Sequence, residues 1–149
     1  MTIYADTSFL VARLYPGDLH HGPARRFFGQ HARAAWLTSS WSQFETVNAL
    51  RQLCLRRPGP DKALVEAIRL LFKHWHKNGP FQLERLDFEE AIADCRKISA
   101  AFGTSRRMRT ADTLHVALLE QIQPDAFVTR DQDQYELARR RGFNAHLVP

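Results

Sequence analysis

The chain has 149 residues, a length that suits one domain with a single core, and 44% of its residues are hydrophobic. Lys and Arg number 21 against 16 Asp and Glu, so the formal charge of +5 favours a polyanionic partner such as a phosphate-bearing substrate. Cys54 and Cys95 form no Cys-x-x-Cys pair, which argues against a disulfide scaffold. No run approaches the roughly 18 apolar residues of a membrane span. We therefore expect a soluble, cytoplasmic protein.

Apolar runs and breaks predict the elements of the first half of the chain. They predict a strand over 2–5, a short helix over 8–14, a helix capped by Asp18 and running to about Phe28, and a strand over 34–38. Two long amphipathic helices follow, with the apolar stripes Phe44, Val47, Leu50, Leu53, Leu55 and Leu64, Ile68, Leu71, Phe72, Trp75. Pro58 and Pro60 separate these helices, so we expect them to pack as a hairpin.

The second half of the chain alternates strands with helices. The pattern predicts a strand over 81–86, a helix from Asp87 to before Gly103, a helix from near Thr110, a strand over 126–128, a helix over 134–141 and a strand over 145–148. This alternation indicates an α/β fold with a mostly parallel sheet that is covered on both faces. The ligand crevice of such a sheet lies outside the carboxyl ends of its strands.

Four acidic residues occupy positions that a small α/β nuclease would need. They are Asp6 directly after the first strand, Glu45 within a long helix, Asp112 in the first turn of another helix, and Asp131 after the strand over 126–128. Carboxylates drawn from both ends of a chain into one pocket repel each other unless a cation lies between them. The set therefore indicates a divalent metal site, with hard oxygen ligands of the kind that Mg²⁺ or Mn²⁺ binds.

Each of these acids also has a purely structural interpretation. Asp6, Asp131 and Asp133 stand where helix caps stand, and Asp112 would be stabilised by the dipole of its helix. Glu45 lies on a polar line of its helix that water could solvate. Helix capping alone, however, does not predict acidic residues at all four of these positions.

Four stretches, taken in order, carry a resemblance to a known family. They are Tyr-Ala-Asp-Thr-Ser-Phe-Leu at 4–10, Glu-Thr-Val-Asn-Ala-Leu at 45–50, Ala-Asp-Thr-Leu-His-Val-Ala at 111–117 and Phe-Val-Thr-Arg-Asp at 127–131. In these stretches the chain resembles the PIN-domain ribonucleases, most closely the VapC-type toxins of toxin–antitoxin systems. The resemblance covers nearly the whole chain and implies a single PIN-like α/β/α sandwich over 1–149.

The resemblance also implies the site residues. It implies a catalytic set of Asp6, Glu45, Asp112 and Asp131, in which Asp6, Asp112 and Asp131 face the metal and Thr7, Ser8 and Thr129 supply supporting hydroxyls. Asp133 is an alternative for the fourth acid, because the chain has Asp-Gln-Asp-Gln-Tyr at 131–135 and lacks the Asp-Phe often seen just past this point. His115, one turn beyond Asp112, is interpreted as no more than a partly buried histidine.

Basic residues next to the acids are candidates for contact with RNA, since four carboxylates would otherwise repel its backbone. The candidates are Arg106, Arg107, Arg109 and Arg130. A solvated loop explains the same residues equally well. His20, His21, His74 and His76 lack a further soft ligand at suitable spacing, so the sequence does not indicate a structural zinc site.

The leading hypothesis is a Mg²⁺- or Mn²⁺-dependent endoribonuclease, the toxin of a VapBC-type pair, with a VapB-like antitoxin as partner and, by resemblance, a homodimeric state. We expect a basic residue of the antitoxin in the acidic pocket, and an apolar groove for it formed by Leu50, Leu53, Leu64, Ile68 and Phe72. The alternatives are a non-catalytic PIN-like RNA-binding or assembly module and a solitary PIN nuclease in RNA processing. A phosphatase of the haloacid dehalogenase type is disfavoured, because Ser8 stands where its second aspartate would be.

Overall fold

The computed structural model describes residues 1–105 and 108–149, and its centre is a sheet of five parallel strands. The strands are β1 (Thr2–Ala5), β2 (Ala35–Ser39), β3 (Phe81–Glu84), β4 (Ala126–Thr129) and β5 (Ala145–Leu147). Their order across the sheet is β3-β2-β1-β4-β5. The chain thus adds strands first on one side of β1 and then on the other, and the switch point between β1 and β4 is where ligands of open α/β sheets bind. The predicted α/β fold with a central parallel sheet is confirmed.

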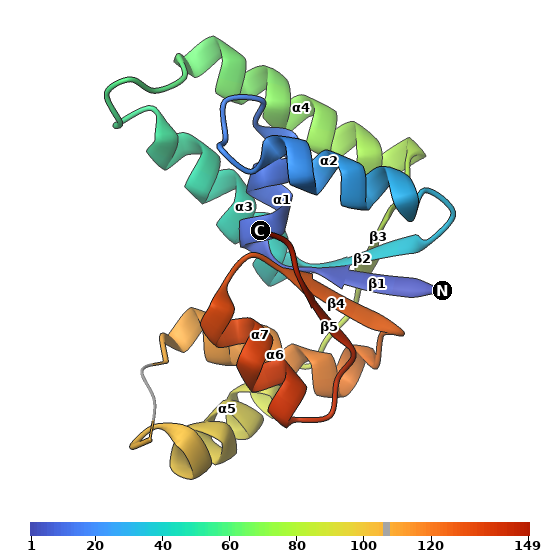
Figure 1. Cartoon of the computed structure of the whole chain (residues 1–149), viewed down its shortest axis with the longest axis vertical. Helices are drawn as coiled ribbons and strands as arrows, with labels where there is room; N and C mark the ends of the chain where they lie inside the picture. Colours follow the sequence, from blue (N-terminus) through green and yellow to red (C-terminus); the bar gives the residue numbers. More distant parts are fainter. Residues whose placement is uncertain (106–107) are drawn as a thin grey trace.

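Helices cover both faces of the sheet (Figure 1). They are α1 (Thr7–Leu14), α2 (His21–Gln30), α3 (Ser40–Leu53), α4 (Lys62–Asn78), α5 (Phe88–Phe102), α6 (Thr110–Ile122) and α7 (Gln132–Arg140). The helices α1 to α4 lie on one face, and α5 to α7 lie on the other. Among the described residues, no helix combines the length and apolar character that crossing a membrane requires.

The central strand β1 is buried on both of its faces. Ile3 and Ala5 belong to the core under α1 to α4, whereas Tyr4 belongs to the core under α5 to α7. Successive side chains of a strand point to opposite faces, so this division follows directly from the pleat. It also directs the Tyr4 ring toward α6, where the ring lies against His115.

Helix α6 is buried along most of its length. Eight consecutive residues, from Asp112 to Leu119, are buried. A helix that is buried all round shows little amphipathic contrast, which explains its nearly continuous apolar sequence. The burial also brings two polar side chains of α6, Asp112 and His115, into the interior of the protein.

The predicted apolar stripes of α3 and α4 are only partly correct. Leu50, Leu53, Ile68 and Phe72 are buried, but Phe44, Leu55, Leu64 and Leu71 are exposed. The reason is geometric. The end of the α3–α4 hairpin extends past the sheet (Figure 1), so Leu55 and Leu64 near that end have no layer to pack against. Phe44 and Leu71 lie within the two helices, on sides that the core does not cover.

Several predicted boundaries also shift. Helix α2 begins at His21 with His20 as its N-cap residue, so the prediction that Asp18 caps it is wrong. The Asp18 carboxylate instead accepts a hydrogen bond from the His20 backbone N–H at 2.8 Å. Strand β3 ends at Glu84, and α7 starts two residues earlier than predicted because Asp131 caps it.

Candidate active site

One cavity of about 540 Å³ lies at the carboxyl ends of β1 and β4. All four predicted acids line it, namely Asp6, Glu45, Asp112 and Asp131. Asp6 follows β1, Glu45 comes from α3, Asp112 comes from the first turn of α6, and Asp131 is the N-cap residue of α7. The fold thus brings together residues that lie up to 125 positions apart (131 minus 6).

Asp6 is fully buried and holds the start of α1. Its Oδ1 accepts the Phe9 backbone N–H at 2.9 Å, and its Oδ2 accepts the Thr129 hydroxyl at 2.9 Å. The Ser8 hydroxyl lies within 2.9 Å of both carboxylate oxygens. Burial raises the pKa of Asp6, while the charge of His115 and these hydrogen bonds oppose the rise without reversing it. A nearby cation would favour its charged form.

Asp112 and Asp131 are linked through Gln134. The Gln134 side-chain N–H donates to Asp112 Oδ1 at 3.0 Å, and its backbone N–H donates to Asp131 Oδ1 at 2.9 Å. Burial raises the pKa of Asp112; the Gln134 hydrogen bond opposes this, and the charge of Asp131 adds to it. Burial and the neighbouring Asp131 carboxylate therefore both disfavour the ionised form of Asp112.

Glu45 is held at one of its two carboxylate oxygens. Its Oε2 accepts the Thr7 hydroxyl at 2.7 Å and lies 2.7 Å from His115 Nε2. Burial by itself raises the pKa of Glu45, but the hydrogen bond and charge of His115, together with the Thr7 hydrogen bond, outweigh this effect and lower it. The surroundings of Glu45 thus favour its ionised form.

His115 is a residue whose importance the sequence interpretation underestimated. It is 1% exposed, so it is fully buried rather than partly buried. Its Nδ1 lies 3.1 Å from the Tyr4 hydroxyl, and its Nε2 contacts Glu45. The available signal was its spacing, since a residue three positions after Asp112 lies on the same side of α6.

The predicted hydroxyl residues lie at the site and are bonded within the protein. Thr7 donates to Glu45, and Thr129 donates to Asp6. Ser8 donates to Asp6 and accepts the Arg130 backbone N–H at 2.9 Å. Their contacts in the structure therefore hold the acids in place.

Arginines stand around the acids. Arg109 and Arg130 line the cavity as predicted, and so does Arg56, which the sequence interpretation did not single out. The Arg130 guanidinium lies 3.7 Å from the Asp18 carboxylate, and Asp18 also lines the cavity. Arg106 and Arg107 lie outside the described residues.

The described lining of the cavity includes Asp131 and does not include Asp133. Asp133 lies in the first turn of α7, whereas Asp131 precedes that helix and caps it. On geometry, Asp131 is therefore the better candidate for the fourth acid.

The donor atoms of the cavity fit a hard divalent cation in their chemistry. In the described part of the chain, no group of three or more His, Cys, Asp or Glu side chains is placed so that it could encircle a metal ion. Mg²⁺ commonly keeps several waters and uses only one or two carboxylates, so an all-protein cage is not required. The raised pKa values of Asp6 and Asp112 are those of carboxylates that a cation would stabilise.

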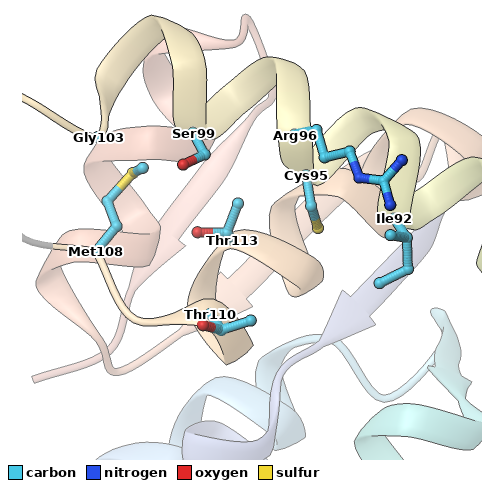
Figure 2. A pocket seen from close by; sticks show the side chains of 8 residues that line it. All are labelled: Ile92, Cys95, Arg96, Ser99, Gly103, Met108, Thr110 and Thr113. Atoms are coloured by element: carbon cyan, nitrogen blue, oxygen red, sulfur yellow. The ribbon is translucent and has the colours of Figure 1, made fainter.

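A second cavity, of about 340 Å³, lies between α5 and the start of α6 (Figure 2). Cys95 and Arg96 of α5 and Thr110 and Thr113 of α6 are among its lining residues. No acidic residue of the described chain lines it. Burial raises the pKa of the Cys95 thiol, which makes that thiol a poor nucleophile. The acidic cavity is therefore the better candidate for chemistry.

Comparison with known proteins agrees with this arrangement. The model of the PIN domain family matches residues 3–140. The chain belongs to the PIN domain family. No curated protein sequence matches the chain. The expectation from the stretches at 4–10, 45–50, 111–117 and 127–131 is thereby confirmed at the level of the family.

Solved structures share the PIN fold with this chain. VapC20 of Mycobacterium tuberculosis, described as a sarcin-ricin loop cleaving toxin, has a TM-score of 0.68 at 19% identity, with 95% of each chain covered. FitAcB of Neisseria gonorrhoeae has a TM-score of 0.62 at 14% identity, covering 96% of this chain and 95% of that one. FitAB bound to a DNA fragment has a TM-score of 0.63 at 16% identity, covering 97% and 94%. At these identities the similarity establishes the fold.

Proposed function

We propose that this PIN-domain protein is a Mg²⁺- or Mn²⁺-dependent endoribonuclease and acts in the cytoplasm as the toxin of a VapBC-type pair. One observation carries the proposal. Four acids from separate parts of the chain line a single cavity at the switch point of the sheet, and arginines border that cavity. Metal-dependent hydrolysis of a phosphodiester uses this combination, since acids bind the cation and basic residues draw in the RNA backbone.

The acids take different roles in this proposal. Asp6, Asp112 and Asp131 would hold the cation, which when bound lowers the pKa of a water molecule and offsets charge on the scissile phosphate. Glu45 is the candidate proton acceptor, because its surroundings favour the carboxylate form. Its Oε2 already accepts two hydrogen bonds, so Oε1 is the oxygen left for the substrate side.

Three arginines would contact the RNA backbone. Arg56 enters the cavity lining from the loop after α3, Arg109 from the start of α6, and Arg130 from the end of β4. They thus come from different elements around the acids, and cations placed in this way can hold a phosphate backbone against four carboxylates.

The decisive experiment is RNA cleavage by the purified protein with Mg²⁺ or Mn²⁺ and with EDTA. We expect cleavage that depends on the cation and is lost in Asp6→Asn and Asp112→Asn. Asp94→Asn is a matched control, because Asp94 pairs with Lys97 on α5 and does not line the cavity. Full activity in both cavity variants, with contaminating nucleases excluded, contradicts the assignment. Comparison of Asp131→Asn with Asp133→Asn decides the fourth acid, and we expect the larger loss for Asp131.

An antitoxin partner is the second part of the proposal. The predicted groove needs revision, since Leu50, Leu53, Ile68 and Phe72 are buried in the core. A cavity of about 320 Å³ between the end of α3 and α4 takes its place, lined by Arg51, Cys54, Leu55, Lys62, Val65 and Glu66. The similarity to VapC20, a toxin, supports this part.

Coexpression with the product of a small adjacent gene tests the antitoxin. We expect a stable complex with suppressed cleavage, in which a basic side chain of the partner enters the acidic cavity. Charge reversal of that side chain should restore cleavage more than it weakens binding. If the product neither co-purifies nor inhibits, the pairing fails and a solitary PIN nuclease in RNA processing remains. Light scattering of the free protein tests the homodimer that we propose.

A non-catalytic RNA-binding or assembly module is the competing function. It is favoured by one observation, that no three metal-binding side chains of the described residues converge as a preformed site. Calorimetry with Mn²⁺ separates the two. A nuclease should bind Mn²⁺ and lose that binding in Asp112→Asn, whereas the module should bind RNA without any dependence on the cation.

A further inference from the structure

A chain of buried polar groups leads from β2 to Glu45. The Ser39 hydroxyl lies 3.1 Å from the Tyr4 hydroxyl, which lies 3.1 Å from His115 Nδ1. On the other side of the same ring, His115 Nε2 lies 2.7 Å from Glu45 Oε2. Ser39, Tyr4 and His115 are essentially inaccessible to solvent. The chain thus connects β2, β1 and α6 in series to one carboxylate oxygen on α3.

The direction of these hydrogen bonds follows from the groups themselves. An ionised Glu45 only accepts, so His115 Nε2 must carry the proton and donate to it. The Tyr4 hydroxyl lies 3.1 Å from Nδ1 on the opposite side of the ring, where a hydroxyl can donate to a neutral ring or accept from a protonated one. Tyr4 and Glu45 thus hold the two ring nitrogens of His115 from opposite sides, and the ring donates from Nε2 to Glu45.

The consequence for Glu45 is that its two oxygens are no longer equivalent. Oε2 accepts from both His115 and Thr7, whereas no hydrogen bond within the described residues engages Oε1. We propose that His115 is a positioning residue, which with Tyr4 behind it fixes Glu45 so that Oε1 faces the substrate. This inference rests on the proposed nuclease function and adds to it a residue that does not touch RNA.

The hydrogen bonds of His115 differ from those of a histidine that only supports the core. His76 provides the comparison within the same chain. It too is held on both ring nitrogens, by Phe72 O at 2.9 Å and by Thr38 Oγ1 at 2.8 Å, but neither of these partners lines the acidic cavity, whereas Glu45, the partner of His115, does. If His115 were only structural, its removal, like that of His76, would lower stability without a specific loss of kcat.

Cleavage kinetics provide the first test, with four variants: His115→Leu, His115→Gln, Tyr4→Phe and the control His76→Leu. His115→Leu should lower kcat roughly ten- to hundred-fold and leave KM for RNA nearly unchanged, since the loss of a group that orients a reacting residue typically has this size. His115→Gln should recover most of the activity, because its amide can donate to Glu45. Tyr4→Phe should give a smaller loss of kcat. Equal losses in His115→Leu and His76→Leu, or an effect on KM alone, overturn the proposal.

The conformational order of the Glu45 side chain can be measured as a second test, which needs no RNA. The Glu45 carboxyl carbon, labelled with ¹³C, should give one ordered signal in the wild type, in His115→Gln and in His76→Leu. In His115→Leu it should show averaging between rotamers. An unchanged Glu45 signal in a folded His115→Leu protein overturns the positioning role. If the wild type cleaves no RNA, the nuclease function fails while this measurement still decides the role of His115.

Discussion

Asp6 shows that a structural and a functional interpretation of one residue can both hold. Its Oδ1 caps α1 through the Phe9 N–H, while the same side chain lines the acidic cavity. The two roles are compatible because a carboxylate offers about four lone-pair sites on two oxygens. Many polar residues could act as the N-cap, but binding a cation as well would require the negative charge of a carboxylate.

Substitution at Asp6 should separate these roles. Asp6→Asn keeps an oxygen for the Phe9 N–H, so we expect near-normal thermal stability with cleavage abolished. Asp6→Ala loses the cap as well and should be less stable by about 1 kcal/mol, the usual value for a lost N-cap. Thermal melts and cleavage assays on both variants check this. A large loss of stability in Asp6→Asn would show that the charge itself supports the fold.

The titration of Asp112 predicts how stability depends on pH. Because burial raises the pKa of Asp112, the folded protein binds this proton more tightly than the unfolded chain does. Without a cation, its contribution is therefore fully present below the ordinary value of 3.8 and is lost as the pH rises through the raised pKa. Glu45 acts in the opposite sense, and its stabilisation is lost only as the pH falls through its lowered pKa.

Asp112→Asn tests this titration. The variant should melt at a higher temperature than the wild type at pH 7 in EDTA, and the difference should shrink as the pH falls toward 4. Added Mg²⁺ should raise the melting temperature of the wild type more than that of the variant. Parallel pH profiles for the two proteins would contradict the proposed destabilisation by a buried charge.

At the scale of elements, the start of α7 couples a helix cap to the acidic cavity. Asp131 caps the helix, and Gln134 of its first turn donates its side-chain N–H to Asp112. The side-chain oxygen of Gln134 is buried and has no hydrogen-bond partner within the described residues. A buried carbonyl in that state costs about 1–3 kcal/mol, so stability alone does not explain Gln134 at this position.

Gln134→Leu should therefore affect cleavage more than stability. The change removes the donor to Asp112, which lowers activity, and it also removes the unpaired oxygen, which offsets part of the lost hydrogen bond. Gln132→Leu is the matched control on the same helix, since Gln132 is exposed and donates to Glu136. Cleavage rates and melting temperatures of the two variants provide the check. A lower melting temperature with an unchanged cleavage rate in Gln134→Leu would show that the residue supports the fold alone.

The elements themselves were largely predictable because their signals are local. The strand at 2–5 has the predicted bounds, and Asp87 caps α5 as expected. The apolar stripes of α3 and α4 were not predictable in full. Periodicity identifies apolar positions of a helix but does not reveal how the helix is rotated on the sheet or where the sheet ends, so Phe44 and Leu55 belonged to the predicted stripe and yet are exposed.

At the scale of the molecule, the site could be predicted as far as topology determines it. Parallel strands end at one edge, so Asp6 and Asp131 were expected together, and they line one cavity. Arg56 and Gln134 were missed, and His115 was interpreted as only a partly buried histidine, because their placement depends on how side chains from distant segments meet. The Glu45–His115 contact spans 70 residues, and no spacing in the sequence encodes it.

The arrangement of charge over the whole molecule gives the final prediction. The formal charge of +5 attracts RNA in general, but only cations at the cavity can hold a phosphate over the acids. Arg56→Gln should raise KM, leave kcat nearly unchanged and reduce the salt dependence of binding by about one phosphate contact. Arg25→Gln is the control, because it lowers the net charge equally from α2, outside the cavity lining. The test is to measure binding and cleavage of RNA by both variants over a range of salt concentrations. Equal effects of both substitutions would mean that the total charge, and not the position of Arg56, governs capture of the RNA.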